Sequence, residues 1–213
     1  AGMGIYQYTG TGSAGTIAHG LGKIPEFIIS KRTGNTGSWV VYHKSIGNAN
    51  EFYLDATDGQ SSASATWNST TPTSSVWSVG TDQNNTSGYT IISYVFAPVK
   101  GFSSIGTYDG NGNANGIFVY TGFKPSWLMV KSTAAGQQWL MIDNKRGYNG
   151  SNELLYADSN EAAGSAEVVD LVSNGFKMRS TGAGNNSNGQ KYIYVAFAAE
   201  PFVASNGDPA TAR

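Results

Sequence analysis

Oxygen-bearing side chains that could hold a cation gather in one short segment. Asp109, Asn111 and Asn113 alternate with glycine, and this places possible ligands at every second position, as in a calcium-binding loop. Ala114 stands where such a loop needs glycine for its sharp turn, and no glutamate closes the segment. The alternative is a turn built on glycines, which needs no metal. Calcium is therefore possible at this segment, and the sequence predicts no other cofactor.

Two aromatic residues in polar segments could serve as platforms for a sugar ring. Trp67 lies in a stretch of Ser, Thr and Asn, and Tyr148 follows Asp143 and Arg146. An exposed ring stacks on a pyranose face while neighbouring polar groups bind hydroxyls. His43 ends a similar apolar run earlier in the chain. These five residues form the predicted ligand site, and the alternative is that each ring packs on its own lobe.

Signatures of common catalytic centres are missing. The chain contains no cysteine, no Gly-x-Ser-x-Gly elbow, no His-Glu-x-x-His and no P-loop. Neither His19 nor His43 has a neighbouring His or Cys. Glycoside hydrolysis needs two carboxyl groups that face one bond, and carboxylates are sparse. We therefore expect a protein that is not an enzyme.

Composition excludes several classes of partner. The 213 residues include 13 Lys or Arg and 14 Asp or Glu, and only 13% of residues are charged. A near-neutral surface argues against nucleic acid, which needs a basic footprint, and against an electrostatic membrane anchor. No apolar run approaches the roughly 20 residues of a membrane-spanning helix. Hydrophobic residues (39%) suffice for a core, and 28 glycines disfavour long helices, so the sequence favours an all-β fold.

One half of the sequence aligns with the other after a shift of 100 positions. The matched pairs include Tyr8/Tyr108, Gly10/Gly110, Gly12/Gly112, Ile17/Ile117, Pro25/Pro125, Lys31/Lys131 and Trp39/Trp139. Residues 84–88 match 185–189 in the same way. Two copies need the same fold but not the same site, so we assign the shared positions to folding. We expect two homologous domains, 1–99 and 100–199, followed by an extended tail, 200–213.

Short strands separated by turns are predicted in each half. Apolar runs follow Pro25 and Pro125, and Trp39 and Trp139 begin the next strands, where we expect both rings to be buried. A spacing of about 8–12 residues over six to eight strands indicates antiparallel β-sandwiches of a jelly-roll or concanavalin-like kind. Whether the halves are separate sandwiches or share one sheet stays open, although the short linker favours two lobes.

Four segments carry a resemblance to a known family. Residues 104–112, 120–131, 173–180 and 192–198 resemble a repeat of tailed-bacteriophage virion proteins, and 201–213 is similar to the end of such chains. The resemblance implies a lectin-like β-sandwich in a tail-fibre, receptor-binding or other surface protein. It brings no catalytic residues.

The expected function is therefore that of a non-enzymatic protein on the virion surface, outside the cell, which binds host or environmental glycan. Its expected partners are other virion proteins and further copies of itself, with the tail lying against another lobe or subunit. Two alternatives remain: a purely structural, self-assembling subunit of a capsid decoration, tail or filament, and a carbohydrate-binding module of a secreted hydrolase. Glycan binding by a monomer would support the expected glycan-binding function, whereas assembly into symmetric particles would support the structural subunit.

Overall fold

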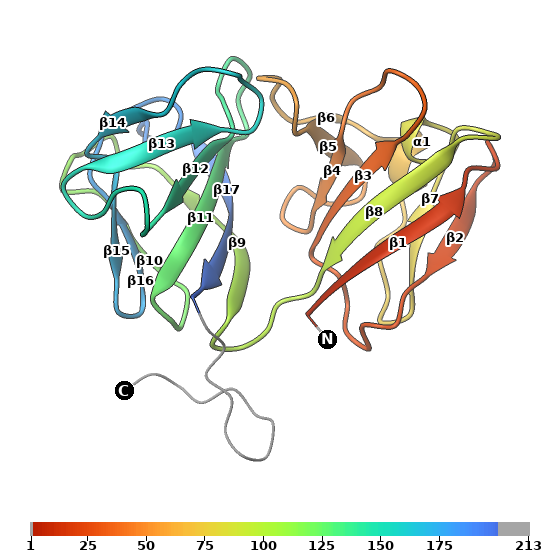
Figure 1. The fold of residues 1–213 in the computed structure, drawn as a ribbon, viewed down its shortest axis with the longest axis horizontal. Coiled ribbons are helices and arrows are strands. Elements are labelled where there is room, and N and C mark those ends of the chain that lie inside the picture. Colours follow the sequence, from red (N-terminus) through yellow and green to blue (C-terminus); the bar gives the residue numbers. More distant parts are fainter. Residues whose placement is uncertain (1, 200–213) are drawn as a thin grey trace. The chain divides into compact units, whose positions relative to one another are not determined.

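The computed structural model describes residues 2–199, and the chain divides into two compact units (Figure 1). The first unit ends at Pro98 and the second begins at Val99. Regular structure is almost entirely β-strand, and the paired strands are antiparallel, so the prediction of an all-β fold is confirmed. Within the described residues no helix has the length and apolar character to cross a membrane. The tail predicted at 200–213 lies outside them.

The first unit consists of a large and a small sheet. The large sheet has the strand order β1-β8-β3-β4-β5-β6, and the small sheet pairs β2 with β7. Two short helices, α1 (Ser64–Trp67) and the 3₁₀ helix η1 (Gln83–Asn85), flank β7 in the chain. The strands are β1 (Met3–Thr9), β2 (Gly15–Ala18), β3 (Phe27–Arg32), β4 (Val40–His43), β5 (Asn50–Tyr53), β6 (Ser61–Ser62), β7 (Val76–Val79) and β8 (Thr90–Phe96).

The second unit repeats this topology. Its large sheet, β9-β17-β11-β12-β13-β14, has the same order of equivalent strands, and its small sheet is β10-β16-β15. Strand β15 is additional, since the first unit has α1 in the corresponding part of the chain. The strands are β9 (Ser103–Asp109), β10 (Phe118–Tyr120), β11 (Pro125–Ser132), β12 (Leu140–Asp143), β13 (Asn152–Tyr156), β14 (Gly164–Ala166), β15 (Val169–Val172), β16 (Gly175–Met178) and β17 (Lys191–Ala198).

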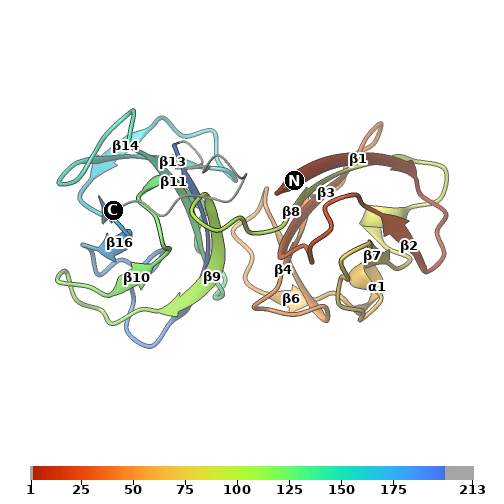
Figure 2. The ribbon, with the colours of Figure 1, turned by 90° about the horizontal axis from the view of Figure 1, so that it is seen from below.

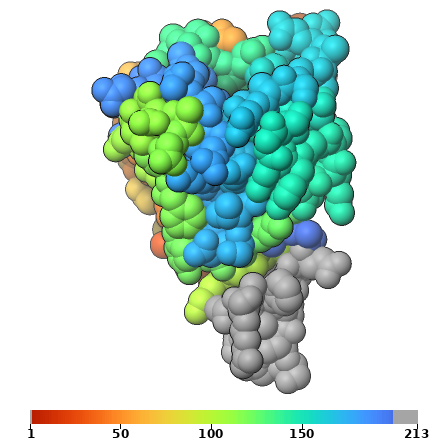
Figure 3. Space-filling model, turned by 90° about the vertical axis from the view of Figure 1, so that its left-hand side faces the viewer, coloured from red at the N-terminus to blue at the C-terminus, as the bar shows by residue number. Residues whose placement is uncertain are grey.

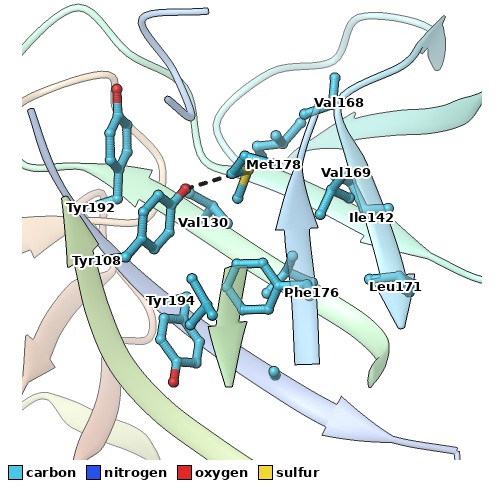
Figure 4. Close-up of a cluster of buried hydrophobic side chains, with 14 of the residues drawn as sticks. Tyr108, Val130, Ile142, Val168, Val169, Leu171, Phe176, Met178, Tyr192 and Tyr194 are labelled. Carbon is cyan, nitrogen blue, oxygen red and sulfur yellow. Dashed lines mark hydrogen bonds between the residues drawn. The ribbon is translucent and has the colours of Figure 1, made fainter. Parts of the chain in front are cut away.

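Each unit buries its core between its two sheets, because alternate side chains of a strand point to the same face. Figure 2 shows β1, β8 and β3 curving over β2, β7 and α1 in the first unit. In the second unit the core includes Tyr108, which stacks on Tyr192 with ring centroids 5.0 Å apart (Figure 4). Phe176 meets Tyr194 edge to face at 5.2 Å in the same cluster. Burial of one such large side chain contributes about 1.5–3 kcal/mol.

The gapless alignment of the two halves is wrong at one strand. Ile17 pairs with Trp77 in the first unit, and Val119 pairs with Phe176 in the second, so β10 lies 102 positions after β2. Strands β3 and β11 remain 100 positions apart. Ile117 is therefore not the counterpart of Ile17. The loop before β10 is longer by two residues and the loop after it is shorter by two, which keeps the inward-facing side chain in register.

A lysine and a tryptophan form the same contact in both units. The amino group of Lys131 donates to the carbonyl oxygen of Gln137 and lies 5.9 Å from the ring centroid of Trp139. In the first unit Lys31 lies 5.7 Å from the ring of Trp39. Trp139 is buried, but Trp39 is only partly buried, so the expected equal burial of the two rings is wrong. The contacts in the structure do not explain this difference.

Candidate functional site

Trp67 lies in the core of the first unit. The residue ends α1, has an exposed fraction of 2%, and meets Tyr42 edge to face with ring centroids 5.7 Å apart. The prediction that Trp67 is an exposed sugar platform is therefore wrong. The helical turn directs the ring inward, and this part of the chain supplies core side chains just as β15 does in the second unit with Val169 and Leu171.

His43 and Asp143 end the equivalent strands β4 and β12, and both hold the turn that follows. Nδ1 of His43 accepts a hydrogen bond from the backbone N–H of Ser45 at 3.2 Å. Oδ1 of Asp143 accepts the N–H groups of Lys145 and Arg146, each at 2.9 Å. His43 is fully buried, so its predicted contact with an external ligand is wrong. The role of His43 is instead to hold the turn after β4 through its hydrogen bond with Ser45.

Asp143 and Arg146 are brought together as predicted, but they bind each other. The guanidinium group of Arg146 lies 2.5 Å from the carboxylate of Asp143. Burial alone would raise the pKa of Asp143, but hydrogen bonds from the Arg146 side chain and from the backbone N–H groups of the turn lower it below its ordinary value. Asp143 and Arg146, which we predicted to bind a ligand, thus neutralise each other's charge.

Tyr148 is the predicted aromatic platform that remains accessible. Its exposed fraction is 41%, its hydroxyl donates to the carbonyl oxygen of Leu171 at 3.3 Å, and the amino group of Lys124 lies 5.1 Å from its ring centroid. Tyr148, Asp143 and Arg146 thus share one loop of the second unit. Trp67 and His43 belong to the first unit and do not contribute to this loop.

The predicted calcium segment opens the loop between β9 and β10. The carboxylate of Asp109 forms a salt bridge with Lys191 at 2.9 Å. Oδ1 of Asn111 accepts from the N–H of Asn113 and from the side-chain amide of Asn186, both at 3.1 Å. Among residues 2–199 no group of three or more His, Asp or Glu side chains could hold a metal ion. The contacts fit the alternative, a turn held by protein groups.

A pocket of about 250 Å³ opens in the second unit, at the other end of β12 from the predicted loop. Leu140 begins β12 and lines the pocket, whereas Asp143 ends the strand. Side-chain amides and an aromatic ring surround the space, and none of the described residues that line it is charged. The polar and aromatic contributors are Gln137 and Gln138 from the β11–β12 hairpin, Tyr156 from β13, and Asn185 from the loop before β17.

Two residue differences distinguish this region of the units: Gln83 faces Gly37 in the first, whereas Gly184 faces Gln137 in the second. In the first unit the side chain of Gln83 crosses to the β3–β4 hairpin, where its Oε1 accepts the N–H of Ser38 at 2.8 Å. The hydroxyl of Tyr8 donates to the carbonyl oxygen of Asn84 at 2.6 Å, and the hydroxyl of Tyr108 donates to that of Asn185 at the same distance. Asn84 and Asn185 are therefore equivalent. Gly184 therefore stands where the first unit has Gln83. The pocket therefore lies where the first unit has the Gln83 side chain, and Gln137 borders it from the hairpin.

Sequence motifs do not reveal the pocket, because its residues come from three distant segments. A signal was nevertheless present in the repeat. Aligning 84–88 with 185–189 places Gly184 opposite Gln83, which is a loss of a large side chain at an otherwise shared position. The shift of 100 positions also places Gln137 opposite Gly37, so the large side chain moves from the loop to the hairpin.

The family model described as a domain of unknown function, DUF7483, matches residues 1–201. The chain belongs to this family. Since the match covers both units, the DUF7483 domain comprises the tandem pair and not a single repeat. No curated protein and no solved structure matches the chain. The description of the DUF7483 family assigns no activity to the domain.

Proposed function

We propose that the protein is a non-enzymatic saccharide-binding module of a virion surface, in a tail fibre, receptor-binding or decoration protein, and that the pocket of the second unit holds one uncharged sugar residue. The observation that carries this proposal is that Tyr156, Gln137, Gln138 and Asn185 line one pocket. An aromatic face stacks on the C–H face of a pyranose, and amides donate to and accept from its hydroxyls.

The size and charge of the pocket define the ligand class. Sites for drug-sized ligands measure about 300–1,000 Å³, and this pocket of about 250 Å³ is slightly smaller. A single terminal sugar therefore fits better than a longer segment. An acidic sugar would require a cationic partner, and the lining offers none among the described residues. The resemblance of residues 104–112 and 192–198 to phage virion repeats supports the location on a virion, which the pocket itself does not address.

A glycan array with the full chain, followed by titration of the best neutral glycan, tests the proposal. The informative variant is Gly184→Gln, which gives the second unit the glutamine that the first unit has at this position. A Cβ at Gly184 would meet only Gln137 Oε1 at 3.6 Å, an ordinary contact, so the variant should fold. We expect it to weaken binding at least about tenfold, and Tyr156→Ala to cost about 1–3 kcal/mol of binding free energy, as for other aromatic stacking.

The matched control is Gln83→Gly, which changes the equivalent position of the first unit and should leave binding to the second unit intact. Absence of any neutral glycan ligand would refute the proposal. Equal affinity of the parent and of Gly184→Gln would also refute it, because the pocket would then not be the site.

A structural, self-assembling subunit is the second candidate, and strand β1 favours it. This strand lies at the edge of its sheet, and its residues Met3 and Ile5 have exposed fractions of 45% and 62%. Edge strands of monomeric proteins usually carry charges or proline that prevent pairing with another chain. Residues 3–9 contain neither.

A further inference from the structure

Two exposed aromatic rings stand two residues apart on β10 of the second unit. Phe118 and Tyr120 have exposed fractions of 47% and 67%, while Val119 between them is buried in the core. Strand β10 is at the edge of its three-stranded sheet. Because successive side chains alternate between faces, both rings lie on the outer face of this sheet. Figure 3 views the second unit from the side on which green segments near β10 adjoin blue segments of the neighbouring strands.

The neighbouring strand β16 completes this surface. Lys177 is directly opposite Phe118, and Gly175 is directly opposite Tyr120. Side chains opposite each other in an antiparallel pair share a face, with Cβ atoms about 4.5–5.5 Å apart. A Cβ at Gly175 would lie 2.9 Å from the Phe118 ring, so this ring occupies the space beside the glycine. We call Phe118, Tyr120 and Lys177 the aromatic strip.

The first unit shows that folding does not require the aromatic strip. Its equivalent strands β2 and β7 place Thr16 opposite Ser78, where the second unit has Phe118 opposite Lys177. Ala18 stands at the position of Tyr120. The same strand pair therefore forms with three small side chains. Phe118 covers Gly175, which replaces Val76 of the first unit, whereas Tyr120 and Lys177 extend from the outer face, away from the core.

Lys177 is the cation of this face that has no acidic partner among the described residues. Asp170 on β15 is opposite Lys177, but its carboxylate forms a salt bridge with Arg179, whose Nε lies 2.5 Å away. Two cations against one carboxylate leave an excess positive charge next to the exposed rings. The surface is thus apolar along β10 and positive along β16.

We propose that the aromatic strip binds the chain of an acidic polysaccharide. The rings of Phe118 and Tyr120 stack on faces of neighbouring sugars, and Lys177 pairs with a carboxylate such as that of a uronic acid. An open face accommodates internal residues of a polymer, whereas the pocket has room for about one sugar. Charge complementarity at Lys177 selects an anionic chain over a neutral one. This site goes beyond the neutral-sugar pocket and uses none of its residues.

Affinity electrophoresis of the full chain in native gels tests the inference, with polygalacturonate as the acidic probe and dextran as the neutral control. We expect retardation by polygalacturonate that decreases between about 0.15 M and about 1 M salt, because screening weakens an exposed ion pair. The triple variant Phe118→Thr, Tyr120→Ala, Lys177→Ser carries the residues of the first unit at these positions. We expect its dissociation constant for polygalacturonate to rise at least about tenfold.

Two further variants separate this site from the others. Gly184→Gln, which closes the pocket, should be retarded by polygalacturonate as strongly as the parent. Lys177→Glu keeps both rings and should abolish retardation by the acidic polymer. This single variant provides the test if the triple variant does not fold. Failure of the pocket to bind neutral glycan would leave these expectations unchanged, so the two proposals fail independently.

Three results would overturn the inference. The first is a parent protein that polygalacturonate does not retard, and the second is a folded triple variant that it retards equally. The third is a parent that elutes as a dimer, does not bind the polymer, and becomes monomeric in the triple variant. That result would assign the aromatic strip to contact between two copies of the chain.

Discussion

Asn186 in the second unit makes the contacts that Asn85 makes in the first. The side-chain oxygens of these buried residues accept the backbone N–H of Asn111 and of Thr11, at 3.0 and 2.9 Å. Each amide nitrogen also donates to two carbonyl oxygens, one in the loop after the first strand and one just before the turn that carries the asparagine. A single side chain thus joins three backbone segments at the same place in both units.

Replacing either asparagine with alanine should destabilise its unit. The change leaves several buried backbone groups without a partner, and each such group costs about 1–3 kcal/mol. Urea denaturation of Asn186→Ala should show a loss of unfolding free energy of at least that size. Asn188→Ala, at an exposed position of the same turn, is the control and should change stability by less than about 0.5 kcal/mol. Equal effects of the two variants would show that the shared contacts are not important for stability.

Trp67→Ala should damage the fold and leave sugar binding unchanged. Removal of a buried tryptophan side chain costs about 3–5 kcal/mol, and Trp67 is 2% exposed. Tyr148→Ala removes a partly exposed ring and should cost no more than about 1 kcal/mol. Thermal unfolding together with titration of the neutral glycan distinguishes the two roles. Loss of binding by a Trp67→Ala protein that keeps its melting temperature would contradict the core assignment.

Glu51 should make the first unit less stable as the pH rises. Its side chain is buried and accepts the hydroxyl of Tyr53 at 2.6 Å. Burial raises the pKa of Glu51, hydrogen bonds from Tyr53 and Thr66 oppose this effect, and the nearby Asp82 carboxylate raises the pKa further. Since the pKa is raised in the folded state, the stabilisation is complete below the pKa of the unfolded chain and is lost as the pH rises through the folded value.

Glu51→Gln, which resembles the protonated acid, should therefore raise the melting temperature of the first unit at about pH 8 and have little effect at about pH 4. Differential scanning calorimetry at both pH values measures the change. Glu153→Gln, which changes a partly exposed glutamate of β13 in the second unit, serves as the control. A larger gain at low pH than at high pH would reverse the predicted sign.

Millimolar calcium should leave the melting temperature unchanged, as should EDTA. Asp109 is already paired with Lys191, and the side-chain oxygen of Asn111 accepts two hydrogen bonds from protein groups. A calcium-dependent rise in melting temperature that disappears in Asp109→Asn would instead assign a metal to this loop. Differential scanning fluorimetry with and without about 1–10 mM calcium makes the comparison.

Ile5→Lys should reduce any self-association through strand β1. A lysine on an edge strand disfavours pairing with a second chain, because its charge would have to be buried. Light scattering after size exclusion should show a lower mass for Ile5→Lys than for the parent if β1 pairs between copies. Ile24→Lys changes an equally apolar residue, 53% exposed, outside the strands and should leave the mass unchanged. An unaltered mass for Ile5→Lys would remove the support for the structural-subunit function.

The repeat in the sequence predicted many of the positions on which the fold depends. Gly12 and Gly112, which the two halves share, have positive φ angles of 70° and 63°. Gly10 and Gly110 are required for another reason, because a Cβ at Gly10 would lie 2.2 Å from the carbonyl oxygen of Thr86. Comparing the halves therefore identified these glycines, although the physical cause at Gly10 is close approach of the backbone and not its dihedral angle.

The sequence by itself determined the strands, their antiparallel class and the shared turn residues, because these follow from local alternation and from constraints that both halves repeat. Only the tertiary structure decided the direction of the Trp67 ring and the pocket beside Gly184. The first unit has no counterpart of β15, and Trp67 fills the corresponding space in its core. The polar residues around Trp67 in the sequence do not indicate this space. The pocket likewise depends on a hairpin, a strand and a loop that meet only after folding. Burial and cavities are set by contacts between distant segments, which no local pattern records.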